Sequence, residues 1–178
     1  GVFAGVAHLL FAPLGMQLTA WQMHLMEAYL RRDADAFGDD PRLASQRVIV
    51  VNSPDVTFLP YVMYLRASRG QVIPRAFLQL AAGARPVECA RPDERTLVVR
   101  VASGFYRTGT ELLVRRGDAP MPVGTTLALS DLTLTVTATS SPDGVPTEIT
   151  LRFAHPLEDP SYRWFTWQGP LLAPIAPP

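Results

Sequence analysis

The chain has 178 residues, of which 48% are hydrophobic, enough for one full domain or for a small domain with an extra segment. Its 16 basic and 16 acidic residues cancel, so no global field attracts it to nucleic acid or to an acidic membrane surface. The basic residues are all arginine, and the single cysteine, Cys89, excludes an internal disulfide.

The first 26 residues carry no formal charge, and the run from Val2 to Leu14 is almost wholly apolar. A span of about 20 apolar residues is long enough to cross a bilayer as a helix. His8 and Pro13 make the stretch less lipid-like, and the alternative is a buried or surface-docked helix pair broken at Pro13. We expect residues 1–32 to form a hydrophobic helical segment and a candidate membrane anchor.

Beyond Pro13, one set of apolar residues recurs at alternating spacings of four and three, which places it along a single stripe of a helix. The stripe comprises Leu14, Leu18, Trp21, Leu25 and Ala28. Such a helix needs a partner surface, so residues 1–30 are expected to contact a membrane or membrane-protein subunits.

The stretch from Asp33 to Pro41 is rich in aspartate, and residues 33–45 are predicted to be an exposed acidic linker. A calcium-binding loop would need an oxygen ligand where Phe37 stands and a glutamate where Ala44 stands. The cluster is therefore not expected to bind a metal.

The β-branched run that begins at Arg47 is typical of a buried strand, and it stops on a polar turn. The Ser53-Pro54-Asp55 sequence has the form of a helix start, with serine as the N-cap. An amphipathic helix over 58–65 and a strand over 73–80 follow. Residues 46–84 are therefore expected to form a βαβ unit.

This turn is the candidate ligand-binding site, comprising Asn52, Ser53 and Asp55. The carboxyl end of a central strand, followed by a helix start, gathers free N–H groups, an amide and a carboxylate in one place. The alternative is a purely structural turn, in which Ser53 caps the helix and Asp55 offsets its dipole.

From residue 85 to 169 the hydrophobic period is two, with hairpin turns near residues 91–95 and 140–144. We predict a mostly antiparallel β-barrel or sandwich; the alternative is one open sheet packed on the 58–65 helix, with Trp164 facing that helix. The aromatic last strand offers Trp164 and Trp167 as contacts for other subunits. The proline-rich tail, 170–178, is expected to lack regular structure. The predicted class is α+β.

The sequence resembles the C-terminal extramembrane region of large, uncharacterised multi-pass membrane proteins of GC-rich bacteria. The likeness rests on residues 7–14 as the end of a last membrane segment, on 48–55 and 97–100, and on 156–160 through Trp167. The resemblance implies a membrane-associated topology and no activity. The start at Gly1 also favours an excised piece of a longer protein, while a stand-alone subunit of a membrane complex is the alternative.

No catalytic signature accompanies these features. Ser53 stands between Asn52 and Pro54 instead of on a Gly-x-Ser-x-Gly elbow, and no glycine-rich phosphate loop follows the strand. The three histidines lack metal-ligand spacing. The sequence therefore favours a non-catalytic assembly domain without cofactor, nucleotide or nucleic acid. The alternative is an enzyme or ligand-binding domain with its site at Asn52–Asp55.

Overall fold

The structure is a computed structural model that describes residues 27–83, 85–107, 109–111, 120–140, 144–169 and 171–178. Helical residues 27–36 open the described part. The elements that follow are η2 (Pro41–Ser45), β1 (Arg47–Asn52), α3 (Phe58–Ser68), β2 (Ala76–Ala81), β3 (Glu88–Asp93), β4 (Thr96–Arg100), β5 (Thr126–Ala128), β6 (Leu132–Thr139), β7 (Pro146–Phe153), β8 (Tyr162–Gln168) and β9 (Leu171–Pro174).

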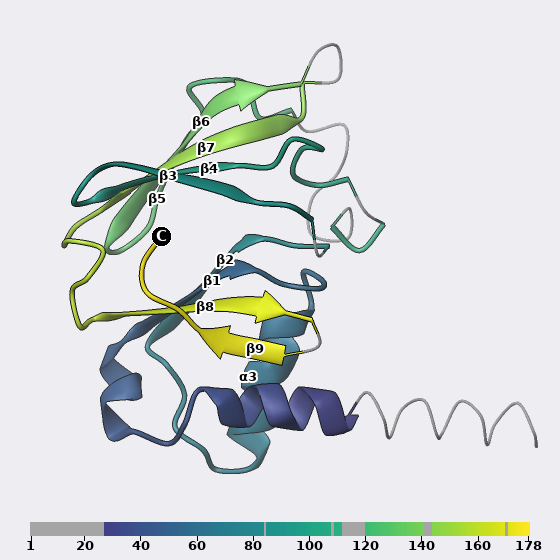
Figure 1. The fold of residues 1–178 in the computed structure, drawn as a ribbon, viewed down its shortest axis with the longest axis vertical. Coiled ribbons are helices and arrows are strands. Elements are labelled where there is room, and N and C mark those ends of the chain that lie inside the picture. The colour runs from purple at the N-terminus through teal and green to yellow at the C-terminus, as the bar shows by residue number, and fades with distance from the viewer. Residues whose placement is uncertain (1–26, 84, 108, 112–119, 141–143, 170) are drawn as a thin grey trace, which may run out of the picture.

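These elements form three layers, with the antiparallel sheet above, the mixed sheet in the middle and the helices below (Figure 1). The mixed sheet has the order β2-β1-β8-β9, in which β1 is parallel to both neighbours and β9 is antiparallel to β8. The other sheet has the order β3-β4-β7-β6-β5 and is antiparallel throughout. The predicted α+β class is confirmed, and so is a βαβ-like unit built from β1, α3 and β2.

The central strand β1 is buried on both faces, which explains its unbroken apolar sequence. Because successive side chains of a strand alternate, Val48 and Val50 face the helices while Ile49 and Val51 face the antiparallel sheet. One strand therefore contributes to both hydrophobic cores.

The predicted antiparallel pairing is confirmed, but the strands do not form the predicted barrel or sandwich module by themselves. They form an open five-stranded sheet, as in the alternative, which packs on the mixed sheet rather than on α3. Trp164 is 4% exposed and belongs to the core between the two sheets, so it faces the antiparallel sheet rather than α3. Its indole N–H donates to the carbonyl of Leu157 at 2.9 Å, and its ring lies 5.7 Å from that of Phe153. Successive side chains of β8 point to opposite faces of the sheet, so Phe165 faces the helices and Trp164 faces the antiparallel sheet.

The C-terminal strands β8 and β9 belong to the mixed sheet and not to the antiparallel sheet. β8 pairs with β1, with Tyr162 opposite Arg47, and β9 pairs with β8. The tail was expected to lack regular structure, but residues 171–174 form this last strand. Proline is tolerated there because β9 is an edge strand and Pro174 is its final residue.

Residues 33–45 are only partly the exposed linker that their acidity suggests, because several of them are buried. Asp33 is 2% exposed, and Phe37 and Leu43 are fully buried. The ring of Phe37 lies 4.7 Å from that of Phe165 in the helix-to-sheet core. The apolar residues between the aspartates therefore decide the packing of this stretch.

The helix after β1 begins later than the serine predicts. Its N-cap is Thr57, which makes no side-chain cap hydrogen bond, and Phe58 is its first residue. Pro60 explains the shift, because it occupies the third helical position, where a helix needs no backbone N–H donor. Ser53 and Pro54 belong to the preceding turn.

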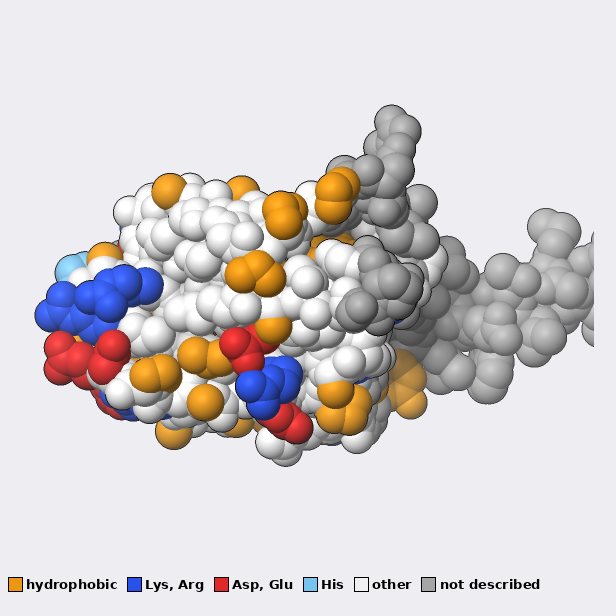
Figure 2. Space-filling model, turned by 90° about the horizontal axis from the view of Figure 1, so that it is seen from above, with side chains coloured by type: hydrophobic (Ala, Val, Ile, Leu, Met, Phe, Trp, Pro, Cys, Tyr) orange, Lys and Arg blue, Asp and Glu red, His pale blue; other side chains and the backbone are white. Residues whose placement is uncertain are grey.

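Ser130 and Asp131 lie in the turn between β5 and β6, where the positions of the hydrophobic residues change from odd to even numbers. Seen from above, over the antiparallel sheet, hydrophobic side chains are scattered singly among polar ones (Figure 2). In the part of the chain that the structure describes, no helix is long and apolar enough to cross a bilayer. Residues 1–26, which carry the anchor prediction, lie outside that part.

Candidate functional site: a groove beside the strand-end turn

The turn after β1 is anchored by Ser53, whose side chain is fully buried. Its backbone N–H donates to the carbonyl of Ala81 at 3.2 Å. Its hydroxyl lies 3.1 Å from the carbonyl of Asp55 and 3.4 Å from that of Ala81. Ser53 therefore ties the turn to the end of β2 and does not cap α3.

Asp55 organises the other end of the turn. Its carboxylate accepts the N–H of Thr57 at 2.7 Å and the hydroxyl of Thr57 at 2.6 Å, and it is also hydrogen-bonded by Thr110. Burial alone would raise the pKa of Asp55, but these hydrogen bonds outweigh burial and lower it. Asp55 is therefore a carboxylate at neutral pH.

Asn52 behaves differently from its two neighbours. Its side-chain oxygen Oδ1 is buried and accepts no hydrogen bond within the described ranges. Buried acceptors are normally paired, because an unpaired one costs free energy on folding. Of the three predicted residues, Asn52 is thus the one that the surrounding fold leaves unsatisfied.

Beside this turn lies a groove of about 780 Å³, bounded by helical residues 27–36, the first half of α3 and the end of β8. We call it the helix groove. Its lining residues are Glu27, Tyr29, Leu30, Asp33, Pro54, Asp55, Thr57, Phe58, Tyr61, Leu65, Thr110 and Trp167. Of the predicted site residues, Asp55 and Trp167 line it. Asn52 and Ser53 lie in the adjoining turn, and Trp164 lies in the core.

Among the described residues, the lining of the helix groove combines aromatic side chains with three acids and contains no arginine. Asp33 is nearly buried, and its carboxylate accepts the N–H of Leu172 at 2.8 Å. Burial raises the pKa of Asp33 despite that hydrogen bond and the nearby Arg32. Glu27, at the exposed end, pairs with Arg31 at 2.5 Å. The groove is therefore apolar in its walls and acidic at its margins.

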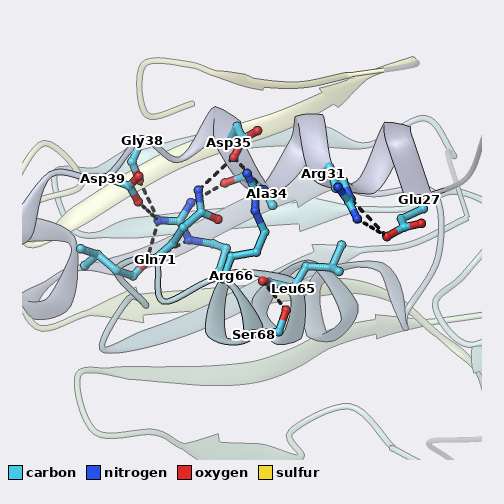
Figure 3. A network of polar contacts seen from close by, with 12 residues as sticks. Glu27, Arg31, Ala34, Asp35, Gly38, Asp39, Leu65, Arg66, Ser68 and Gln71 are labelled. Carbon is cyan, nitrogen blue, oxygen red and sulfur yellow. Dashed lines mark hydrogen bonds and ion pairs between the residues drawn. The ribbon is translucent and has the colours of Figure 1, made fainter.

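The two helical walls are held together by Arg66, which is fully buried (Figure 3). Its guanidinium donates to the carbonyl of Ala34, to that of Gly38 at 2.7 Å and to that of Val72 at 2.6 and 2.9 Å. It also contacts the carboxylate of Asp39 at 3.2 Å. Because one rigid guanidinium joins the end of the first helix to α3, the groove is a preformed feature of the fold.

Sequence patterns missed most of the groove. The spacing of Phe58, Tyr61 and Leu65 indicated an amphipathic helix, but not that one flank of it would be left uncovered. The stripe residues Leu14, Leu18, Trp21 and Leu25 lie outside the described residues. Within the described ranges, no cluster of three or more potential metal ligands occurs.

Comparisons with protein families, with characterised proteins and with solved structures find no match for this chain.

Proposed function

We propose that the chain is a non-catalytic assembly domain of a membrane-associated protein or complex, and that its helix groove receives an apolar helical segment of a partner. The observation that carries the proposal is the lining of the groove by Leu30, Phe58, Tyr61, Leu65 and Trp167. One wall of the groove, helical residues 27–36, directly follows the charge-free stretch 1–26. The groove is thus adjacent to the part of the chain with the strongest membrane character.

The geometry supports a helix-in-groove mode of recognition. In that mode an amphipathic helix places its apolar face in a hydrophobic groove, and a few buried aromatic contacts supply most of the affinity. The three acids at the margins, Glu27, Asp33 and Asp55, favour an occupant that carries a basic residue next to its apolar stretch. Apolar membrane segments flanked by arginine or lysine have that composition.

A second candidate function, ligand binding at the strand-end turn, is favoured by the unsatisfied Oδ1 of Asn52. An N–H or O–H donor of a ligand would satisfy this oxygen, with the Asp55 carboxylate close by in sequence. Asn52→Ala would then abolish binding of such a ligand, whereas on the assembly proposal it leaves the helix groove unchanged.

Two exposed tyrosines on α3 provide a matched test. Tyr61 is 51% exposed and lines the helix groove, while Tyr64 is 66% exposed and does not. The probe is a fluorescent leucine–alanine helix with lysines at one end, added to the full chain in mild detergent. Tyr61→Glu should weaken binding at least about tenfold, or about 1.4 kcal/mol, because it adds an acid to an apolar, acidic groove.

Tyr64→Glu makes the same chemical change outside the groove and should alter binding less than about threefold. Fluorescence anisotropy measures both affinities. Equal effects of the two substitutions, or no binding by the wild-type chain, would refute the groove as the assembly site.

A further inference from the structure

Four strands form the edges of the two sheets, and three of them carry features that discourage pairing with another chain. β5 has only three residues, and β9 has four and ends on Pro174. β3 contains Pro92, charged residues and a register irregularity after Ala90. Natural proteins protect edges in these ways against unwanted strand addition.

The fourth edge, β2, has none of these features. Its six residues, Ala76–Ala81, include no charge and no proline, and its pairing with β1 shows no register shift. The backbone N–H of Arg47 donates to the carbonyl of Ser161, on the β8 side of β1. Successive residues of a strand direct their backbone N–H and C=O groups to opposite sides, so those of Val48 and Val50 point towards β2. With Val48 opposite Phe77, the N–H and C=O groups of Phe77 and Gln79 then point away from β1.

A second groove, of about 250 Å³, runs along this edge, and we call it the edge groove. Residues 77–82 line its length. Val56 and Pro60 form the wall on the α3 side, and Phe105, Tyr106 and Glu111 form the opposite wall. Because these walls flank the edge of β2 on both sides, a single extended chain fits between them. A sheet that carries packed layers of its own would collide with the walls.

The wall formed by Phe105, Tyr106 and Glu111 is braced by a buried ion pair. Arg85 pairs with Glu111, which is 4% exposed, and it also donates to the carbonyls of Gly104 and Ala82. Tyr106 has a φ of 60°, a left-handed conformation that a non-glycine residue adopts only when its surroundings enforce it. The edge groove is therefore preformed, like the helix groove.

Gln79 supplies a polar group within the edge groove. Its side-chain nitrogen donates to the carbonyl of Asp55 at 3.1 Å, which fixes the orientation of the amide. Its Oε1 is buried and accepts no hydrogen bond from the residues that the structure describes. A donor on an added strand would satisfy this oxygen.

We propose that an extended, uncharged peptide segment of a partner protein adds to β2 as a further strand of the mixed sheet. Its main chain pairs with the outward groups of Phe77 and Gln79, and its side chains alternate between the two walls of the edge groove. Among the described residues of the lining, the charged one is Glu111, and it is already paired with Arg85, which favours an uncharged peptide. This surface lies on the opposite flank of α3 from the helix groove and does not depend on the function proposed for that groove.

The test uses the full chain and a blocked peptide of alternating threonine and valine as the probe. Residue-resolved amide exchange should show at least about tenfold slower exchange at Phe77 and Gln79 when the peptide is bound. Phe77→Pro removes an outward N–H without removing a bond to β1, and should weaken the peptide at least about tenfold. If this variant fails to fold, the exchange measurement on the wild-type chain decides the question.

Two further variants serve as controls. Phe77→Ala keeps the N–H and should weaken binding less than about threefold, while Ala128→Pro, on the β5 edge, should leave binding unchanged. Three results would overturn the proposal: no slowing of exchange at about 1 mM peptide, equal losses from Phe77→Ala and Phe77→Pro, or a dimer of the chain that Phe77→Pro dissociates. The last result would assign the edge to a second copy.

Discussion

The two faces of the mixed sheet are built from the same strands but are closed to different extents. Towards the antiparallel sheet, the core around Trp164 is a continuous packed layer. Towards the helices, Phe37 and Phe165 pack over Val48 and Val50, but among the described residues one flank is hollowed by the helix groove. The sheet-to-sheet face therefore serves packing alone, whereas the helix face combines packing with the groove that we propose as a binding surface.

The largest expected effect is on the closed face. Trp164→Ala should lower the free energy of unfolding by about 3–5 kcal/mol, because it leaves a cavity and removes the donor to Leu157. Trp167→Ala should cost less, since Trp167 is only partly buried and lines the helix groove. Denaturant unfolding of both variants provides the measurement. Similar losses would contradict the distinction between the two faces.

On the helix face, Arg66→Ala should cost about 3 kcal/mol, because it leaves the carbonyls of Ala34, Gly38 and Val72 without their donor. Asp39→Asn tests whether the ion pair matters. The Asp39 side chain is 61% exposed, so this change should cost less than about 0.5 kcal/mol. A large loss in Asp39→Asn would assign the stabilisation to the ion pair instead.

The two faces should also respond to pH with opposite signs. On the sheet side, burial would raise the pKa of Asp131, but Arg47 and Arg75 outweigh burial and lower it. A lowered folded-state pKa gives stability that is present above the ordinary value of 3.8 and is lost as pH falls below it. The advantage of the wild-type chain over Asp131→Asn should therefore shrink as the pH falls through 3.8 and below.

Asp33, on the helix side, has a raised pKa because of its burial. A raised folded-state pKa gives stability that is fully present below 3.8 and is lost as pH rises through the folded value. Asp33→Asn keeps an acceptor for the Leu172 N–H, so it should gain stability relative to the wild-type chain as pH rises towards neutral. Urea unfolding across this range measures both trends, and slopes of the same sign for the two variants would contradict the assignment.

The smallest effect concerns the strand-end turn. Ser53→Ala should cost about 1 kcal/mol, since it removes a buried hydroxyl that bonds the turn. Ser45→Ala is the matched control, because its hydroxyl also donates to a carbonyl, that of Arg42, but is exposed. The control should cost less than about 0.5 kcal/mol. Thermal unfolding distinguishes the two values.

Local patterns predicted the elements better than their arrangement. The β-branched run after Arg47 and the alternating strands from Glu88 onwards specify their own conformation, because burial on two faces or on one leaves a distinct period. The partner of Tyr162 could not be predicted in this way. Its pairing with β1 depends on contacts between residues 115 positions apart, which no short window contains.

The place of the strand-end turn in the fold was predicted, whereas ligand binding at this turn stays a prediction. Asn52, Ser53 and Asp55 do lie at the carboxyl end of a central strand, where the change from strand to turn is visible in the sequence. The helix groove was not predicted, since it arises where Trp167 of β8 meets residues 27–36 and α3. The acidity of residues 33–40 was misleading, because Phe37 and Leu43 outweigh the aspartates in deciding burial.

The position of β1 between β2 and β8 has a consequence for biosynthesis. β1 and β2 can pair early, but the second neighbour of β1 is made only after the whole antiparallel sheet has been synthesised. One edge of β1 stays unpaired until then, and closing so long a loop is slow. A ribosome-bound chain that stops before Tyr162 should therefore remain bound to chaperones. Addition of β8 and β9 completes the mixed sheet and should end chaperone binding.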